Sequence, residues 1–565
     1  MRLQPIFDIA AICAAKGIKD AVVCPGSRCA PLTLAFARHP AIKTRTISDE
    51  RSAGFIALGI AQQTKRTVVL ICTSGTAAYN FAPAVAEAYY QRIPLMILTA
   101  DRPVEWIGQW DGQTISQQQI YGKHVLRSYQ LPQEYDHADS KWSITRIVNE
   151  GINTTQGDVR GPVHINVPLR EPLYPAKGEE IGFTKDIRVT ERIVGKNVLT
   201  PKIFQQLNDF KRVLLVGGQY SLSVNLVAAL NSLTDIAIVG DVISNLHPLP
   251  NTIRYSDAFL PVLDETTRAS LRPDLLITIG QSVISKNLKI FLRANKALAH
   301  WHVDESIDEI IDPFQSVTTQ IRQNPEDFFN ALVKALHPDN DRKVYSKRWI
   351  ELDQKASQAV NGFFDKHTSG ELAFVDQVMK AIPDHSNLHL ANSMSVRYAN
   401  FCGLPENKKG VQVYSNRGTS GIDGCTSTVV GHALSSDTIH TLITGDIAFF
   451  YDRNAFWNNY PAPNLRVIVL NNHGGVIFGI IDGPGATAEA SEYFVTTQPL
   501  SAKHLAAEFN LDYRSITATD NITSILDEFF KTGDRAKILE FESSSKEAKE
   551  VFLQFKEQIK TAYVS

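Results

Sequence analysis

The chain has 565 residues, of which 44% are hydrophobic and 21% charged, and its formal net charge is -2. These proportions are ordinary for a globular protein, and the near-neutral charge excludes a global basic field that could hold nucleic acid. Because a domain usually has roughly 100–200 residues, the length predicts three domains.

The cysteines and the N-terminus indicate a cellular compartment. The six cysteines show neither a CxxC pair nor the spacing of zinc ligands, which is typical of reduced thiols in a cytosolic protein. The first 20 residues carry acids and lysines and lack the apolar run and cleavage site of a signal peptide. No apolar stretch approaches the roughly 20 residues that span a bilayer. We therefore expect a soluble cytoplasmic protein.

Three regions of the chain alternate short apolar strands with amphipathic helices, which predicts parallel sheets covered by helices on both faces. The expected strands of the first region are 20–24, 67–72, 94–99 and 162–167. Those of the second are 212–216, 236–239, 275–279 and 300–303, and those of the third are 387–390, 411–414, 438–444, 466–470 and 537–541. The polar stretch 174–201 and the charged helical stretch 340–366 are interpreted as linkers.

This pattern predicts an α/β fold of three doubly wound parallel-sheet domains, at residues 1–180, 195–335 and 345–565. In such sheets ligands bind at the carboxyl ends of the strands. We therefore look for chemistry in the residues that directly follow the expected strands.

Two dipeptides of the third region follow neighbouring strands. Gly445-Asp446 ends one strand, and the next strand ends in Asn471-Asn472-His473-Gly474-Gly475, with 24 residues between Asp446 and Asn471. Adjacent parallel strands would bring the two ends side by side. Each dipeptide alone is common at turns, but the pair at this spacing predicts a site for a metal ion and a diphosphate.

The residue types at these two strand ends suit magnesium. A carboxylate, an amide oxygen and a glycine-exposed carbonyl are hard oxygen donors, and Mg²⁺ completes its octahedron with phosphate oxygens and water. The glycines would let the backbone approach the phosphates. The expected metal ligands are Asp446, Asn472 and Gly474.

A second element supports an anion site. The segment 416–424, NRGTSGIDG, precedes a helix and is rich in small and hydroxyl-bearing residues, which favours a nest of N–H groups. An ordinary capped helix start is the alternative for this segment.

Several sequence motifs of the chain resemble those of a known family. GD…NN is the diphosphate–magnesium motif of thiamine-diphosphate-dependent enzymes. Together with CPGSR, SDERSAGF, TADRP, ANSMSVR and NRGTSGIDG, it resembles the 2-succinyl-5-enolpyruvyl-6-hydroxy-3-cyclohexene-1-carboxylate synthase branch, of menaquinone biosynthesis. The similarity spans essentially the whole chain.

The resemblance implies a pyrimidine-binding, a central and a diphosphate-binding domain, with thiamine diphosphate and Mg²⁺ or Mn²⁺ as cofactors. It implies a homodimer or tetramer, because in the family the cofactor lies between the first domain of one subunit and the third of another. The implied reaction decarboxylates 2-oxoglutarate and adds the succinyl-semialdehyde carbanion to isochorismate. Such a transferase, or carboligase, needs no nucleic acid and no membrane span.

The resemblance also implies the cofactor-binding residues. Glu50 stands where the family places the catalytic glutamate beside the aminopyrimidine ring, whereas Asp49 is expected to cap a helix. Ile422 stands where a bulky residue supports the bent cofactor. The remaining expected contacts are Thr419, Ser420, Gly421, Asp423, Gly445, Asp446, Asn472, Gly474 and Ile477.

Both implied substrates are dicarboxylates, and arginine side chains suit carboxylates best. A single arginine is usually a solvated surface charge, but several stand in the family motifs close to strand ends. The expected substrate-binding residues are Arg28, Arg102, Gln113, Lys286, Ser393, Arg397, Arg417, Ile477 and Phe478.

Three positions depart from the family pattern, namely His473, Gly112 and Asn287, and they leave the details of substrate binding open. The segment 214–219, LLVGGQ, lacks the full GxGxxG pattern, so a structural turn is favoured over a dinucleotide site.

Two other functions stay open. One is a related 2-oxo acid decarboxylase or acetolactate-type synthase, and the other is a non-catalytic cofactor-binding homologue.

Overall fold

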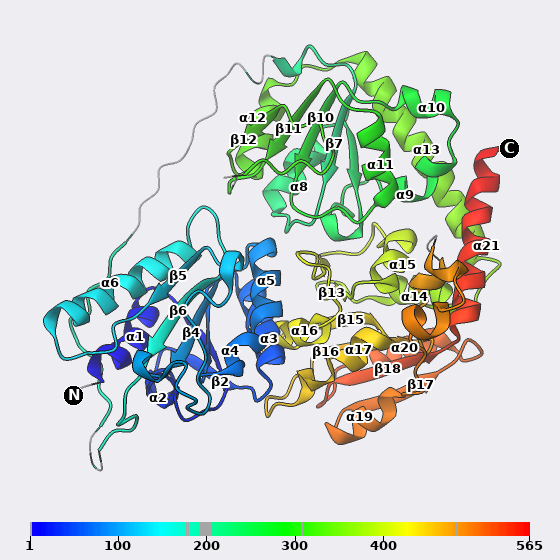
Figure 1. Ribbon diagram of the computed structural model, residues 1–565. Coiled ribbons are helices and arrows are strands. Elements are labelled where there is room, and N and C mark those ends of the chain that lie inside the picture. Colours follow the sequence, from blue (N-terminus) through cyan, green and yellow to red (C-terminus); the bar gives the residue numbers. More distant parts are fainter. Residues whose placement is uncertain are drawn as a thin grey trace. The chain divides into compact units, whose positions relative to one another are not determined.

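The computed structural model describes residues 3–176, 178, 180–191, 203, 206–306, 309–480 and 483–564. It contains three six-stranded sheets whose paired strands are all parallel (Figure 1). The predicted α/β class is therefore confirmed. None of the helices in the described ranges is long and apolar enough to cross a membrane.

By its internal contacts the chain divides into two compact units. The first unit comprises Met1–Gly195, Asn416–Asp437 and Tyr451–Ala462, and the second comprises Lys196–Ser415, Thr438–Phe450 and Pro463–Ser565. The first unit holds one sheet and the second holds two. The three domain boundaries expected from the sequence stay a prediction.

The first sheet has the order β2-β1-β3-β4-β6-β5. Helices α1, α2 and α6 pack on one face, and α3 and α5 pack on the other. The inner strands are buried along their whole length, as parallel strands covered on both faces should be. The strands are β1 Asp20–Val23, β2 Lys43–Thr46, β3 Val68–Cys72, β4 Leu95–Asp101, β5 Arg127–Gln130 and β6 Val163–Pro168, and the helices are α1 Gln4–Ala15, α2 Ala30–Arg38, α3 Glu50–Thr64, α4 Thr76–Asn80, α5 Ala82–Gln91 and α6 Ala138–Thr155.

The second sheet has the order β12-β11-β10-β7-β8-β9. Its two apolar faces are covered by α8 and α12 on one side and by α9, α11 and α13 on the other. The strands are β7 Val213–Gly217, β8 Ala237–Gly240, β9 Thr252–Ile253, β10 Leu275–Ile279, β11 Ala299–Val303 and β12 Thr319–Ile321, and the helices are α8 Val224–Asn231, α9 Ser256–Phe259, α10 Glu265–Ser270, α11 Lys286–Ala294, α12 Pro325–Ala335 and α13 Asn340–Phe364.

The third sheet, β14-β13-β15-β16-β18-β17, repeats the strand order of the first. Helices α14, α15, α20 and α21 form one large core with its inner strands. The strands are β13 Asn387–Leu390, β14 Gln412–Tyr414, β15 His440–Gly445, β16 Leu465–Asn471, β17 Asp512–Ile516 and β18 Lys537–Glu542, and the helices are α14 Gly370–Ala381, α15 Met394–Cys402, α17 Asp446–Tyr451, α18 Ile477–Ile480, α19 Ala502–Glu508, α20 Ile522–Phe529 and α21 Ser545–Val564. The helix α16 Cys425–Ala433, which lies between these in the sequence, belongs to the first unit.

The stretch 340–366, interpreted from the sequence as a linker, is largely occupied by the single helix α13. Trp349 is fully buried in it, and Phe363 and Phe364 join the core of the third sheet. The charged residues between them had hidden this apolar face, so α13 is a packed part of the second unit. The other expected linker, 174–201, lies partly outside the described residues.

Two helices of the first unit that are far apart in the sequence, α3 and α16, lie side by side (Figure 1). Their backbones touch at two glycines. A Cβ on Gly59 would stand 2.1 Å from the carbonyl oxygen of Thr428, and a Cβ on Gly431 would stand 2.2 Å from that of Ile56. Only glycine permits this approach, because a backbone carbonyl cannot rotate away as a side chain can.

We expect Gly59→Ala to destabilise the protein by about 1–3 kcal/mol, because the overpacked crossing outweighs the better helix propensity of alanine. Urea denaturation followed by circular dichroism measures this change. Gly362→Ala in α13 is the matched control, since its Cβ meets only the Gln558 side chain, at 3.7 Å, and stability should stay equal or rise. Equal stabilities of Gly59→Ala and the native protein would contradict the packing argument.

Candidate functional site

The site is built on β15 and β16 of the second unit. These strands pair in parallel with Gly445 opposite Leu470, so Asp446 and Asn471 leave the sheet at the same edge. The side-by-side strand ends expected from the sequence are therefore present. Asp446 and Asn472 are both buried.

Asp446 is held by two donors. Its Oδ1 accepts the backbone N–H of Ile447 at 2.8 Å, and its Oδ2 accepts the side-chain amide of Gln498, also at 2.8 Å. The same Gln498 amide lies 3.2 Å from Oδ1 of Asn471. Burial raises the pKa of Asp446 despite these bonds. A nearby cation would offset that cost, because it favours the ionised carboxylate.

Asn472 is fixed from two sides. Its Nδ2 donates to Oε1 of Glu371 at 2.8 Å, and the Ser545 hydroxyl lies 3.0 Å from its Oδ1 and 2.9 Å from its carbonyl oxygen. Glu371 lies in the first turn of α14 and is almost completely buried. Burial, and to a smaller extent the neighbouring Asp446, raises the pKa of Glu371 to about 7.

The loop after Asn472 presents backbone to this edge of the sheet. A Cβ on Gly474 would stand 2.7 Å from Cγ1 of Val495, so no side chain fits there. His473 has a left-handed backbone, with a φ of 61°, and its Nε2 lies 3.1 Å from the carboxylate of Glu542. Phe478, in the helix that starts at Ile477, is partly exposed and faces the ring of Phe494.

These residues fit a divalent cation. The donor types are a carboxylate, an amide oxygen and the backbone of a glycine loop, all hard oxygen donors of the kind that Mg²⁺ takes. Asp446 and Glu371 are both buried carboxylates, and Asp446 lies close enough to Glu371 to help raise its pKa. A bound metal ion would offset the unfavourable burial of this negative charge. The assignment of Asp446, Asn472 and Gly474 as ligands stays a proposal.

The segment 416–424 belongs to the first unit, where it meets an internal carboxylate. Glu87 of α5 accepts the backbone N–H groups of Gly418 and Thr419 at 2.9 and 2.6 Å, and the Thr419 hydroxyl at 2.5 Å. Gln91 donates a further bond to Glu87 at 2.6 Å. These donors of the expected anion nest are therefore engaged by Glu87, whereas the roles of Ser420, Gly421, Ile422 and Asp423 stay predictions.

Glu50 stands at the start of α3. Asp49 caps this helix as expected, because its carboxylate accepts the N–H groups of Arg51 and Ser52 at 2.9 and 3.2 Å. Glu50 is half-buried, and its Oε2 lies 3.4 Å from the side-chain amide of Asn80. Its carboxylate therefore does not serve as the cap and is available for another role.

The expected substrate-binding residues fall into both units. In the first, Arg28 and Arg102 follow β1 and β4, and burial together with the neighbouring Arg102 lowers the pKa of the Arg28 guanidinium. The backbone of Gln113 packs over Gly75, directly after β3. The structure thus gathers these three at the carboxyl edge of the first sheet. Arg417 belongs to the same unit.

The second unit holds the other expected substrate contacts. Ser393 follows β13 and has a φ of 75°, and Arg397 donates to its carbonyl oxygen at 2.5 Å. Lys286 is exposed at the start of α11, on the second sheet. The roles of these residues stay predictions.

The turn after β7 has a structural role. The N–H of Gly218 donates to Ile279 and that of Gln219 to Ser282, while the Gln219 side chain donates to the carbonyl of Ser415. The two backbone bonds close the turn within the second sheet, and the Gln219 side chain joins it to the segment after β14 of the third sheet. They support the structural-turn interpretation over a dinucleotide site.

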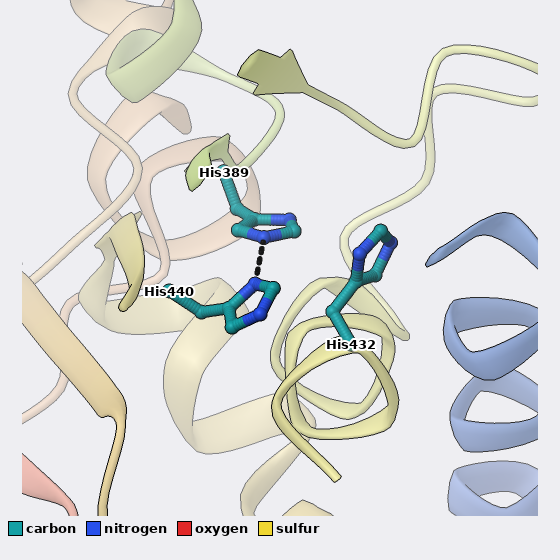
Figure 2. A group of neighbouring side chains, drawn as sticks. All are labelled: His389, His432 and His440. Carbon is teal, nitrogen blue, oxygen red and sulfur yellow. Dashed lines mark hydrogen bonds between the residues drawn. The ribbon is translucent and has the colours of Figure 1, made fainter. Parts of the chain in front are cut away.

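Buried histidines of the third sheet lie away from this edge. Figure 2 shows His389 and His440, on β13 and β15, joined by a hydrogen bond of 3.1 Å. His440 begins β15 whereas Asp446 follows its end, which is about 20 Å along a strand. Burial lowers the pKa of His440 to about 4, so the ring stays neutral. His432, also drawn, belongs to the first unit, where its ring nitrogens contact Gln62 and Gln63.

Three buried or partly buried contacts were not identified from the sequence, namely those of Glu371, Gln498 and Glu87. Each residue lies far along the chain from the residue it holds, at separations of 101, 52 and 331 residues. Spacing within a motif carries no signal for such contacts. A glutamate inside an otherwise apolar helix, as at Glu87, was an available hint.

Comparison with known proteins places the chain in a family. Residues 7–120 match the model described as "Thiamine pyrophosphate enzyme, N-terminal TPP binding domain", and residues 189–390 match "Middle domain of thiamine pyrophosphate".

Three similar relatives are each named 2-succinyl-5-enolpyruvyl-6-hydroxy-3-cyclohexene-1-carboxylate synthase. The protein of Cytophaga hutchinsonii is 44% identical over 100% of both chains. That of Bacteroides thetaiotaomicron is 35% identical over 93% of this chain and 92% of its own. That of Flavobacterium johnsoniae is 36% identical over 94% of each. The chain therefore belongs to the 2-succinyl-5-enolpyruvyl-6-hydroxy-3-cyclohexene-1-carboxylate synthase family of thiamine pyrophosphate enzymes.

Proposed function

We propose that the chain catalyses the decarboxylation of 2-oxoglutarate and the addition of the remaining four-carbon fragment to isochorismate in menaquinone biosynthesis, with thiamine diphosphate and Mg²⁺ or Mn²⁺ as cofactors. The observation that carries this proposal is the pair of strand ends at Asp446 and Asn472 in a chain of this family. When bound, thiamine diphosphate supplies the electron sink for decarboxylation.

The residues of the chain would then bind the cofactor and the substrates, orient them, and exchange a proton with the cofactor. Asp446, Asn472 and the backbone of Gly474 would hold the metal ion and through it the diphosphate. Glu50 would share a proton with the aminopyrimidine ring. Arg28 and Arg102, together with Gln113, would bind substrate carboxylates, since the guanidinium fork matches them. Ser393, Arg397, Arg417 and Lys286 are proposed as further contacts on the substrates, with Ile477 and Phe478 as an apolar wall.

The family resemblance also supports a homodimer or tetramer with shared sites, built from a pyrimidine-binding domain (1–180), a central domain (195–335) and a diphosphate-binding domain (345–565). A cytoplasmic location is proposed as well. All six cysteines are free and buried, which fits a reducing compartment.

The metal site is tested by ligand-induced stabilisation. Binding to the folded state adds about 2.7 kcal/mol when ligand is 100-fold above its Kd, so Mg²⁺ with thiamine diphosphate should raise the Tm of the native protein. Asp446→Asn should lose this rise. Its metal-free Tm should stay close to native, because the substitution removes a carboxylate whose pKa burial raises. Differential scanning fluorimetry measures both values, and an unchanged rise in the variant would refute the assignment.

The role of Glu50 is tested against its neighbour. Glu50→Gln should lower kcat by roughly 100-fold or more, the range of proton-transfer catalysis, while keeping the cofactor-induced rise in Tm. Asp49→Asn is the matched control, because asparagine also caps helices and turnover should persist. Isochorismate consumption measures the rates. Equal activity of Glu50→Gln and the native enzyme would overturn the assigned role.

Substrate choice separates this function from related ones. With 2-oxoglutarate and isochorismate, mass spectrometry should show the joined product and CO₂, whereas pyruvate should give little turnover, because it lacks the second carboxylate that the arginines bind. Pyruvate turnover with 2-oxoglutarate ignored would indicate an acetolactate-type enzyme or a simple decarboxylase. No turnover despite cofactor binding would indicate a non-catalytic homologue.

A further inference from the structure

Glu371 is a buried carboxylate in direct contact with a proposed metal ligand. Its Oε1 accepts the side-chain amide of Asn472 at 2.8 Å and the hydroxyl of Ser543 at 3.0 Å. Only 1% of the residue is exposed. Over the parts of the second unit that the structure describes, no lysine, arginine or histidine forms an ion pair with it.

This contact fixes which way the amide of Asn472 points. A carboxylate accepts hydrogen bonds and offers none when ionised, whereas an amide has a donating and an accepting end. Glu371 therefore selects the NH₂ end of Asn472. The Oδ1 end then faces the other way, where the Ser545 hydroxyl lies 3.0 Å from it. A flipped amide would set two acceptors against each other.

We propose that Glu371 is a positioning residue for the metal site, and that its carboxylate holds the Asn472 amide so that Oδ1 is presented to the divalent cation. The inference rests on the proposed assignment of Asn472 as a ligand. Partners of this kind orient metal ligands, and their loss typically weakens metal affinity 10- to 100-fold.

The second oxygen of the carboxylate makes a conservative rescue possible. The hydroxyl of Tyr398 lies beside the carboxylate of Glu371, and no other described residue bonds its Oε2. In Glu371→Gln the amide oxygen can still accept from Asn472, while its NH₂ faces the Tyr398 oxygen. Glu371→Met has nearly the same length and accepts no such bond.

The test is a titration of the full-length variants with MgCl₂ at a fixed saturating concentration of thiamine diphosphate, followed by isothermal titration calorimetry. Glu371→Met should raise the Kd for Mg²⁺ 10- to 100-fold, and Glu371→Gln should stay within about threefold of the native value. A native Kd in Glu371→Met overturns the inference. Should that variant not fold, Glu371→Asp carries the test, since its shorter side chain retains the charge but withdraws from Asn472 and should weaken binding about tenfold.

A double-mutant cycle separates this inference from the site assignment. If Glu371 acts through Asn472, Glu371→Met should raise the Kd for Mg²⁺ no further in an Asn472→Ala background. Additive losses would overturn the positioning role, whereas an Asn472→Ala variant with native Kd would refute the ligand assignment itself. Asp353→Asn is the control for a partly buried carboxylate elsewhere in the unit. Asp353 accepts the N–H groups of Arg254 and Tyr255, so its loss should lower Tm and leave the Kd unchanged.

Discussion

The parallel pairing of β15 with β16 is the constraint on which the proposed site depends. Their register, with Gly445 opposite Leu470, brings a carboxylate and an amide to one edge although 24 residues separate Asp446 from Asn471. A shift of one residue would turn these side chains to opposite faces of the sheet, because side chains alternate along a strand. Both strands are buried over nearly their whole length, as strands of a parallel sheet covered on both faces are.

The inner strands of all three sheets could be predicted from the sequence, and the outer ones mostly could not. Buried parallel strands such as VVLIC are short apolar runs that stand out from amphipathic helices. Five of the six edge strands, β2, β5, β9, β12 and β17, were not identified. Four of these five include at least one residue that is not buried, and sequences such as KTRT and DYRSI carry charges that a solvated edge permits. Their strand conformation comes from pairing with a neighbour, which no local pattern reveals.

The candidate site likewise contains residues that the sequence could indicate and contacts that it could not. The residues of the strand ends, Asp446 and Asn472, stand in a motif whose spacing follows from a strand-helix-strand unit, so the sequence could indicate them. The groups that hold them come from elsewhere, since Glu371 lies on α14 and Gln498 lies after the helical turn at 490–495. Their contacts depend on how whole elements pack. The anion nest at 416–424 illustrates the same limit, because the sequence indicated N–H donors but not that Glu87 meets them.

Buried carboxylates in both units hold loops and helix starts in place. Glu87 accepts four bonds around Gly418 and Thr419, and Asp452 accepts the N–H and hydroxyl of Ser427. Burying a charge is unfavourable unless several donors compensate, so each such group requires its donors in one arrangement. Where donors are fewer the cost remains, and burial raises the pKa of Asp452 to about 7, as it does for Glu371. A segment held in this way has little freedom to rearrange when a ligand binds, and that rigidity lowers the entropy lost on binding. Stability given up at these carboxylates therefore becomes preorganisation of the segments that they hold.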